Sequence, residues 1–283
     1  MNGQQIDLRG QVALITGAAA GIGKGIAQVL AAAGARVAIC DIQPKVVDVG
    51  EEIAAATGQD VFATTADVRE AEDVRRFVDA TVTRFGRLDI AVANAGVWRP
   101  TDPLADDWAK AQAEWDLIVD TNLRGVFLTG RACIPHLVAA SGAGGPTGGS
   151  NSSANLVIIA TDHICPPPGH ATGGGTRMDI YDASKWGLVG LTQSWAKRLA
   201  ASGVRVNALC MDATDSEMVR FASGAAATPE VIARWMRPEQ IGGLLLDLLA
   251  EGPGGRSGEN IGIWMGHPIA LPARREVLPS RHP

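Results

Sequence analysis

The sequence predicts an α/β fold in which seven parallel strands form one doubly wound sheet with helices on both faces. Short apolar runs alternate with helical stretches along most of the 283 residues, and strands that crossover helices bury on both faces have this apolar character. A glycine-rich turn separates the first apolar run, residues 12–15, from the first helical stretch. An acidic residue, Asp41, ends the second run. The alternation, the turn and the acid together are typical of a sheet that binds a ligand at the carboxyl ends of its strands.

The turn after the first strand contains Gly17, Gly21 and Gly23, with Ile22 between the last two. Glycine lets the backbone approach a ligand closely, and the helix that follows points free N–H groups and its positive dipole end at the same place. A pyrophosphate fits this environment. Asp41 lies 24 residues after Gly17, where dinucleotide-binding sheets place a carboxylate that accepts from the adenosine ribose. The alternative is a strand–helix–strand unit without a ligand.

The remaining elements follow from apolar spacing. Residues 70–85 repeat apolar side chains at helical spacing and end at Gly86. The stretch 108–139 is long enough for a break, because Pro135 interrupts its pattern and Asn122 lies in its interior, where an amide competes with backbone hydrogen bonds. The expected strands cover 12–15, 36–40, 60–64, 88–93, 155–160, 205–209 and 260–265, and the expected helices after the first cover 45–56, 70–85, 108–139, 180–202, 229–237 and 238–250.

The chain reads as a single domain with three insertions. Segment 141–154 is rich in Gly and Ser, and we expect a surface connector without a function of its own. Segment 165–178 has three prolines and three consecutive glycines, and its place beyond a strand end predicts that it borders a substrate pocket. Segment 211–237 should form a loop or small lid and a short helix. The tail after His267 should pack irregularly or reach a neighbouring subunit.

Composition favours a soluble protein that binds a small molecule. Apolar residues make up 46% of the chain, charged residues 19%, and the net charge is −5 without a basic concentration, which argues against nucleic acid and anionic membranes as partners. The N-terminus lacks a signal-peptide pattern, and no apolar stretch reaches membrane-spanning length. The four cysteines are isolated, which indicates buried reduced thiols. We therefore expect a cytoplasmic protein without a metal site.

Polar or tight-turning residues follow the third and fourth strands. Asp67 and Val68 come after the third, and Asn94, Ala95 and Gly96 open the loop after the fourth. Ligands bind at the carboxyl ends of such strands, so we expect both segments at the binding site. An N-cap for the next helix is an equal explanation of Asp67, and a plain turn is the alternative for Asn94.

Tyr181 and Lys185 lie four residues apart in the clearest helix of the chain and therefore on one helical face. A phenol with a pKa of about 10 is a poor acid or base at neutral pH, but an ammonium one turn away, together with a positively charged cofactor ring, would favour its ionised form. This pair could carry acid–base chemistry. An exposed helical pair without a role is the alternative, and the glycine turn earlier in the chain argues against it.

Three motifs resemble the signature of the short-chain dehydrogenase/reductase family. They are the segments 16–23 (TGAAAGIG), 121–125 (TNLRG) and 181–185 (YDASK), and the resemblance extends from residue 8 to about residue 266. It implies a Rossmann-type fold and a hydride transfer between a nicotinamide cofactor and a secondary alcohol or ketone. It also implies a homotetramer or homodimer in which the long helices at 108–139 and 180–202 pair with copies of themselves.

The resemblance assigns a role to each matching residue. Tyr181 would donate or accept the proton, and Lys185 would bind the nicotinamide ribose and lower the Tyr181 pKa. Asn122 would distort its helix and hold a relay water. Asp67 would lie near the adenine, and the turn at 94–96 would support the cofactor.

The chain departs from the family pattern at three places. Thr161 stands where the family has a serine; its hydroxyl can donate the same hydrogen bond, so we expect activity. His163 is a candidate substitute, although a lone histidine is more often structural. The spacing from Thr161 to Tyr181 is longer than usual because of the 165–178 insertion. Met211-Asp212 replaces a Pro-Gly pair, and Ser216 replaces a later threonine.

Charge predicts NAD as the cofactor, because Asp41 would repel the 2′-phosphate of NADP. The leading hypothesis is an NAD-dependent alcohol dehydrogenase or ketone reductase. The alternatives are a non-catalytic NAD-binding protein of the same fold and an NADP-preferring carbonyl reductase. Tryptophans at positions 98, 108 and 115 suggest an apolar pocket rim for a cyclic or aryl-bearing alcohol, with core packing as an equal explanation.

Overall fold

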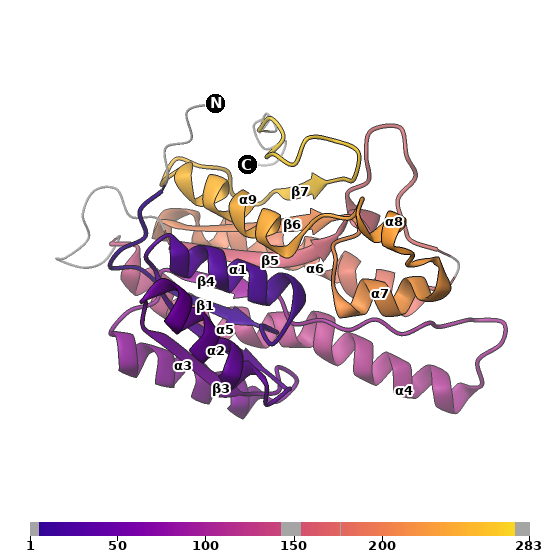
Figure 1. The fold of residues 1–283 in the computed structure, drawn as a ribbon, viewed down its shortest axis with the longest axis horizontal. Helices are drawn as coiled ribbons and strands as arrows, with labels where there is room; N and C mark the ends of the chain where they lie inside the picture. Colours follow the sequence, from indigo (N-terminus) through magenta and orange to yellow (C-terminus); the bar gives the residue numbers. More distant parts are fainter. Residues whose placement is uncertain (1–5, 143–153, 176, 275–283) are drawn as a thin grey trace.

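The computed structural model describes residues 6–142, 154–175 and 177–274, in which seven strands form one sheet (Figure 1). The strands are β1 (Val12–Thr16), β2 (Arg36–Asp41), β3 (Val61–Thr65), β4 (Ile90–Ala93), β5 (Ala154–Thr161), β6 (Val204–Met211) and β7 (Asn260–Ile263). They lie in the order β3-β2-β1-β4-β5-β6-β7, and each neighbouring pair is parallel. The predicted fold is confirmed, and each strand end lies within two residues of its expected position.

Helices lie where the apolar spacing predicts them in most of the chain. The exceptions are the stretch 108–139, which is interrupted, and the stretch 211–237, which holds two short helices. The α-helices of the described residues are α1 (Gly21–Ala32), α2 (Val46–Thr57), α3 (Ala71–Phe85), α4 (Trp108–Val119), α5 (Gly125–Ala140), α6 (Asp179–Leu199), α7 (Glu217–Ser223), α8 (Pro229–Ile232) and α9 (Pro238–Ala250).

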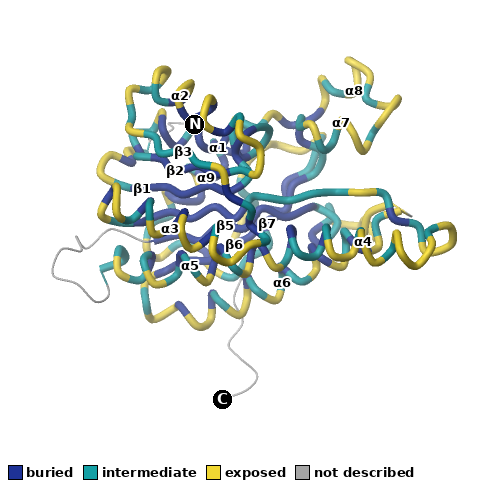
Figure 2. Tube along the Cα trace, turned by 90° about the horizontal axis from the view of Figure 1, so that it is seen from below, coloured by how far each residue is buried: buried dark blue, intermediate teal, exposed yellow. Residues whose placement is uncertain are grey.

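Two helical layers cover the sheet. On one face, α1 and α9 bury Ile26 and Leu245 in a cluster with strand residues such as Ile39. On the other face, α3 and α5 bury Phe77 and Leu137 in a second cluster. Figure 2 shows the strands buried between layers whose outer surfaces are exposed. Removing this apolar surface from water is the main stabilising contribution to the fold.

The strand order determines where a ligand can bind. β1 lies between β2 and β4, so the chain runs outward in one direction from β1 through β2 and in the other through β4. The crossover connections diverge at this point and leave a crevice at the carboxyl ends of β1 and β4. The glycine turn follows β1 and the turn at 94–96 follows β4, so both predicted segments lie at the crevice.

The long helix expected at 108–139 is divided into α4 and α5 by one π-helical turn, Asp120–Arg124. Asn122 lies in this turn. Pro135 lies inside α5 without ending it. The break that the sequence suggested is therefore present, and the residue associated with it is the asparagine rather than the proline.

The expected helix at 229–237 is shorter than predicted, because α8 ends at Ile232. Met236 then pairs with the chain after β6: its N–H donates to the Ala213 carbonyl at 3.1 Å, and its carbonyl accepts from the Asp215 N–H at 2.8 Å. These bonds require extended backbone and so exclude a helix at Met236. The short helix α7 forms part of the segment expected to be a lid.

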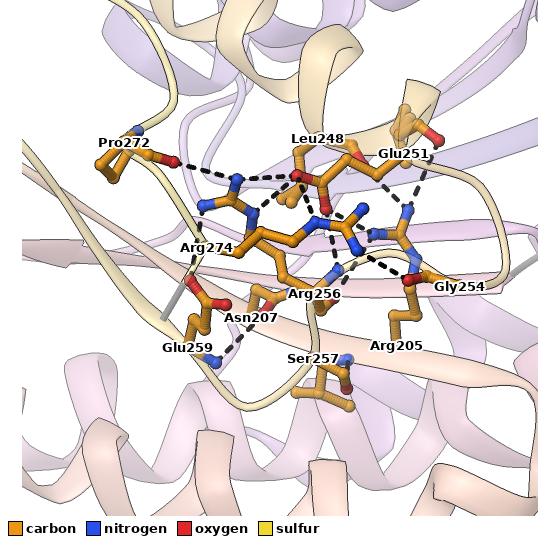
Figure 3. Close-up of polar contacts among 12 residues, drawn as sticks. Arg205, Asn207, Leu248, Glu251, Gly254, Arg256, Ser257, Glu259, Pro272 and Arg274 are labelled. Atoms are coloured by element: carbon orange, nitrogen blue, oxygen red, sulfur yellow. Dashed lines mark hydrogen bonds and ion pairs between the residues drawn. The ribbon is translucent and has the colours of Figure 1, made fainter. Parts of the chain in front are cut away.

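A buried cluster of arginines anchors the end of the described chain (Figure 3). Arg256 donates to Glu251 at 2.8 Å and to the Pro272 carbonyl at 3.1 Å. Arg205, at the start of β6, donates to the Leu248 carbonyl at 2.9 Å. Arg274 donates to the Gly254 carbonyl at 2.9 Å. The segment after His267 therefore packs on its own chain up to residue 274, at the amino ends of β6 and β7.

Two expectations concern other parts of the chain. Most of segment 141–154 (residues 143–153) lies outside the described residues, so its interpretation as a connector stays a prediction. Among the helices that the structure describes, none has the length and apolar character needed to cross a membrane.

Candidate active site

A cavity of about 680 Å³ opens at the carboxyl edge of the sheet. Of the fourteen residues that the sequence predicts for the site, twelve line this cavity. Gly23 and Asn122 are absent from its lining. The residues that the structure brings together are Gly17, Gly21, Ile22, Asp41, Asp67, Val68, Asn94, Ala95, Gly96, Thr161, Tyr181 and Lys185.

The glycine turn has a backbone that other residues rarely adopt. Gly17 has φ of +67° and Gly21 of +53°. A Cβ on Gly17 would lie 2.6 Å from the Ala95 Cα, so the turn requires glycine because the loop after β4 passes against it. No side chain caps the N-terminus of α1 after Ala20, which leaves backbone N–H groups to bind an anion.

Gly23 and Asn94 hold this turn in shape. A Cβ on Gly23 would lie 2.3 Å from the Gly17 carbonyl oxygen and 2.5 Å from Asn94 Nδ2. Asn94 Nδ2 donates to the carbonyls of Thr16 and Gly17, both at 2.8 Å. Gly23 therefore allows α1 to pack closely behind the turn. Asn94 joins the end of β4 to the end of β1.

Two carboxylates lie at the other end of the cavity. Asp41, at the end of β2, accepts from the Ala19 N–H at 3.0 Å and the Gln43 N–H at 2.9 Å. Asp67 is paired with Arg69 at 2.6 Å, and the side-chain hydrogen bonds from Arg69 lower the Asp67 pKa. Asp67 does not cap the next helix, which Glu70 precedes directly. Arg69 also lines the cavity, and its position after β3 was the only sign of this in the sequence.

Asn122 joins two segments that border the cavity by hydrogen bonds. Its side chain is fully buried, accepts from the Val97 N–H at 2.7 Å and donates to the Val97 carbonyl at 2.9 Å. Its Nδ2 also donates to Ser184 Oγ at 3.2 Å. The amide therefore fixes the loop after β4 to the helix that carries Tyr181 and Lys185.

Tyr181, Lys185 and Thr161 meet at one end of the cavity. Lys185 is buried, its Nζ donates to the Ile159 carbonyl at 3.3 Å and lies 5.5 Å from the centre of the Tyr181 ring. Burial lowers the Lys185 pKa to about 8. Burial also raises the Tyr181 pKa, against the effect of a side-chain hydrogen bond with Thr161. The carboxylates of Asp182 and Asp162 shift the Tyr181 pKa in the same direction as burial.

Comparisons with known proteins agree with this geometry. A family model described as short chain dehydrogenase matches residues 11–225. The chain belongs to this family. It is 33% identical to a cis-4-hydroxycyclohexanecarboxylate dehydrogenase of Sinomonas cyclohexanicum over 82% of this chain and 86% of that protein. It is 36% identical to a (-)-trans-carveol dehydrogenase of Rhodococcus erythropolis over 75% and 74% of the two chains.

A solved structure gives the same result for the fold. The 3-ketoacyl-(acyl-carrier-protein) reductase of Brucella melitensis, crystallised with NADH, has a TM-score of 0.73 and 27% identity, covering 92% of this chain and 99% of that one. The predicted family resemblance is confirmed. The protein is a short-chain dehydrogenase, an oxidoreductase whose family binds a nicotinamide cofactor.

This short-chain dehydrogenase has two carboxylates beside Thr161 that sequence reasoning did not assign to the site. Thr161 and Met211 are register partners in β5 and β6, so Asp162 and Asp212 follow at the same edge and both line the cavity. Burial and then the charge of Asp212 raise the Asp162 pKa. Asp212, which replaces the usual glycine, accepts from the Met265 N–H at 3.1 Å. The available signal was that both residues directly follow strand ends.

The 165–178 insertion is tied to the active site by a histidine and an aspartate. His163 Nδ1 lies 2.6 Å from Asp182 Oδ1, and Asp182 Oδ2 accepts from the Gly174 N–H at 2.8 Å. The His163 carbonyl accepts from the Gly173 N–H at 2.7 Å. The imidazole lies edge-on to the Tyr181 ring, with 5.9 Å between ring centres. The expectation that this insertion borders the pocket agrees with Met178, which lines the cavity.

Apolar side chains form another part of the cavity wall. It consists of side chains from the loop after β4, from the insertion and from α7. Trp98 also meets Phe221 of α7, with 6.1 Å between ring centres, so the lid segment contacts the loop opposite it. The apolar residues are Val97, Trp98, Met178, Met218, Val219 and Ala222.

Proposed function

We propose that this short-chain dehydrogenase is NAD-dependent and interconverts a secondary alcohol and a ketone. One observation carries the proposal: Tyr181, Lys185 and Thr161 line the same cavity as the glycine turn and Asp41. Acid–base groups and a dinucleotide-binding turn in one cavity are what a hydride transfer requires.

The residues fit a nicotinamide dinucleotide. The close approach at Gly17 and the uncapped N-terminus of α1 suit a pyrophosphate, and Asp41 suits the adenosine ribose. Val68, with Asp67, would border the adenine, and Lys185 would bind the nicotinamide ribose. When bound, the cofactor accepts or supplies the hydride at its nicotinamide ring.

The chain itself supplies the proton transfer and the polar contacts. Tyr181, kept protonated by burial, holds a proton that it can give to a ketone oxygen or recover from an alcohol. The Thr161 hydroxyl can donate a second hydrogen bond to that oxygen. Asn122 fixes the positions of these groups through Val97 and Ser184, and we retain the expectation that it also supports a relay water.

Charge supports NAD over NADP. Asp41 presents a carboxylate where the 2′-phosphate would lie. The nearest basic residue of α1, Lys24, is engaged at 2.7 Å by Glu52. The Brucella melitensis relative was crystallised with NADH.

A cyclic secondary alcohol is the substrate class that the cavity favours. Part of its wall is apolar, and the two dehydrogenase relatives are named for cyclohexane and carveol substrates. We further propose that the protein acts in the cytoplasm as a single domain, assembled as a homotetramer or homodimer. Exposed aromatic side chains on the long helices, Trp108, Trp115, Phe127 and Trp186, support assembly.

The test is to incubate the protein with NAD and a panel of cyclic secondary alcohols and to follow the absorbance of the reduced cofactor. We expect turnover, and we expect Tyr181→Phe to bind NADH normally while kcat falls by about 10²- to 10⁴-fold, as for loss of a general acid–base group. A protein that binds NADH but turns over no alcohol or ketone would support the non-catalytic alternative. Turnover with NADP alone would support the carbonyl reductase.

A further inference from the structure

His163 is held in one orientation by one hydrogen bond and by packing against Gly174 and Tyr181. Its Nδ1 meets Asp182 Oδ1 at 2.6 Å, and the second oxygen of that carboxylate accepts from the Gly174 N–H. A Cβ on Gly174 would lie 2.4 Å from His163 Cε1, so the insertion packs directly on the imidazole. The ring therefore has little freedom to rotate between Gly174 and Tyr181.

The carboxylate also decides which nitrogen carries the proton. An ionised carboxylate only accepts hydrogen bonds, so the neutral imidazole must have its hydrogen on Nδ1. Its Nε2 is then a hydrogen-bond acceptor. Among the described residues Nε2 has no partner, and it is not among the buried polar atoms that lack one. His163 lines the cavity, so solvent or a ligand in the cavity can reach this atom.

The surroundings of His163 allow this acceptor to discriminate between substrates. Met178 lies beside the imidazole, because a Cβ on Gly174 would lie 2.4 Å from His163 Cε1 and 2.7 Å from Met178 Sδ, and the apolar side chains of Trp98, Met218 and Val219 line the same cavity. An acceptor left unpaired when a substrate excludes water costs about 1–3 kcal/mol. A substrate whose own hydroxyl reaches Nε2 avoids this cost, and one without a donor does not.

We propose that His163 and Asp182 form a substrate-recognition pair, in which His163 Nε2 accepts a hydrogen bond from a second hydroxyl group of the substrate. The inference rests on the proposed function, and it narrows the substrate class to cyclic secondary alcohols that carry another hydroxyl. Asp162 and Asp212 also line the cavity, and two carboxylates favour a neutral hydroxyl over an anionic group at this position.

The first experiment compares cyclohexanol with the isomeric cyclohexanediols, using the cofactor that supports turnover, at about pH 9 where imidazole groups are neutral. The wild-type protein should oxidise at least one diol with kcat/KM about ten- to hundred-fold above that for cyclohexanol. In His163→Phe this ratio should fall to about one, and NADH titration of the variant shows whether it has folded.

A second variant tests the tautomer. In Asp182→Asn, the Gly174 N–H can only donate, so the carbonyl oxygen of the new amide must face it and the NH₂ group must face Nδ1. The hydrogen then moves to Nε2, which becomes a donor. The wild-type protein should prefer the best diol over its monomethyl ether, which cannot donate from the ether oxygen. Asp182→Asn should lose that preference and keep the preference for the diol over cyclohexanol.

The outcomes separate this inference from the proposed function. If His163→Phe keeps the diol preference, or if the wild-type protein oxidises cyclohexanol at least as well as every diol, the recognition pair is wrong and the dehydrogenase function stands. If Asp182→Asn still discriminates against the ether, the acceptor role of Nε2 is wrong. If the wild-type protein turns over no alcohol with either cofactor, the proposed function fails and this inference fails with it.

Discussion

Burial acts on Tyr181 and Lys185 in the same way, because it disfavours the charged form of each side chain. The Tyr181 pKa rises and the Lys185 pKa falls to about 8. The two residues lie one helical turn apart, which the sequence shows, but their hydration depends on β5, β6 and the loop after β4. The spacing of the two residues therefore does not reveal the direction in which burial shifts the Tyr181 pKa.

The Lys185 ammonium should make folding stability depend on pH. Between the folded pKa of about 8 and the unfolded value of 10.5, the unfolded chain binds more protons, so the free energy of unfolding contributed by this residue rises with pH. Below pH 8, Lys185→Met should be more stable than the wild-type protein by up to about 3 kcal/mol. Urea unfolding should show the difference shrinking towards pH 10.5; a difference independent of pH would contradict a buried ammonium.

Asp41 should control cofactor choice through its charge. In Asp41→Ala, loss of the repulsion toward the 2′-phosphate should raise the ratio of NADP to NAD affinity by about tenfold or more. Asp48→Ala is the control, because this carboxylate of α2 is exposed and is not among the residues that line the cavity. Fluorescence titration with NADPH and NADH measures both ratios. Equal shifts of the affinity ratio in the two variants would show that the charge of Asp41 does not control cofactor choice.

At the scale of elements, the π-helical turn shows how one side chain shapes a helix. Asn122 is fully buried, and all three of its side-chain bonds reach outside its own helix, to Val97 and Ser184. Helical spacing predicts α4 and α5 as one element with a break. The bonds that explain the break join segments 25 and 62 residues away, which a local pattern cannot show.

The arginine cluster should stabilise the amino ends of β6 and β7. Arg256→Met removes the bonds to Glu251 and to the Pro272 carbonyl, and leaving a buried charge with weaker partners should lower the free energy of unfolding by about 3–5 kcal/mol. NADH affinity should not change, because the cavity lies at the opposite ends of the strands. The control is Arg75→Met, whose exposed pair with Glu72 should contribute about 0.5 kcal/mol. If urea unfolding gave equal losses of unfolding free energy for Arg256→Met and Arg75→Met, the cluster would stabilise the fold no more than an exposed ion pair does.

At the scale of the whole molecule, the exposed aromatic side chains on the long helices are where we expect the proposed self-association to occur. Trp108 of α4 is 83% exposed and Trp115 is 51% exposed, while Trp186 of α6 is 44% exposed, and α4 packs against α6. Water-exposed indole groups on adjacent helices are typical of an interface.

Sedimentation velocity should show a dimer or tetramer, and Trp115→Glu combined with Trp186→Glu should shift it toward monomer. Phe221→Glu is the control, because this residue is 63% exposed and belongs to α7 rather than to either long helix. A monomeric wild-type protein would contradict the assembly.

The sequence by itself determined the sheet, the glycine turn, the acid at position 41 and the Tyr181–Lys185 pair. Each is a local pattern, set by apolar period or by residues within one or two turns of each other. Only the tertiary structure decided that Asp182 orients His163, that Asp212 lies beside Asp162 and that burial raises the Tyr181 pKa. These results depend on which strands pair and on which side chains lose water, and both are properties of the packed chain rather than of any segment.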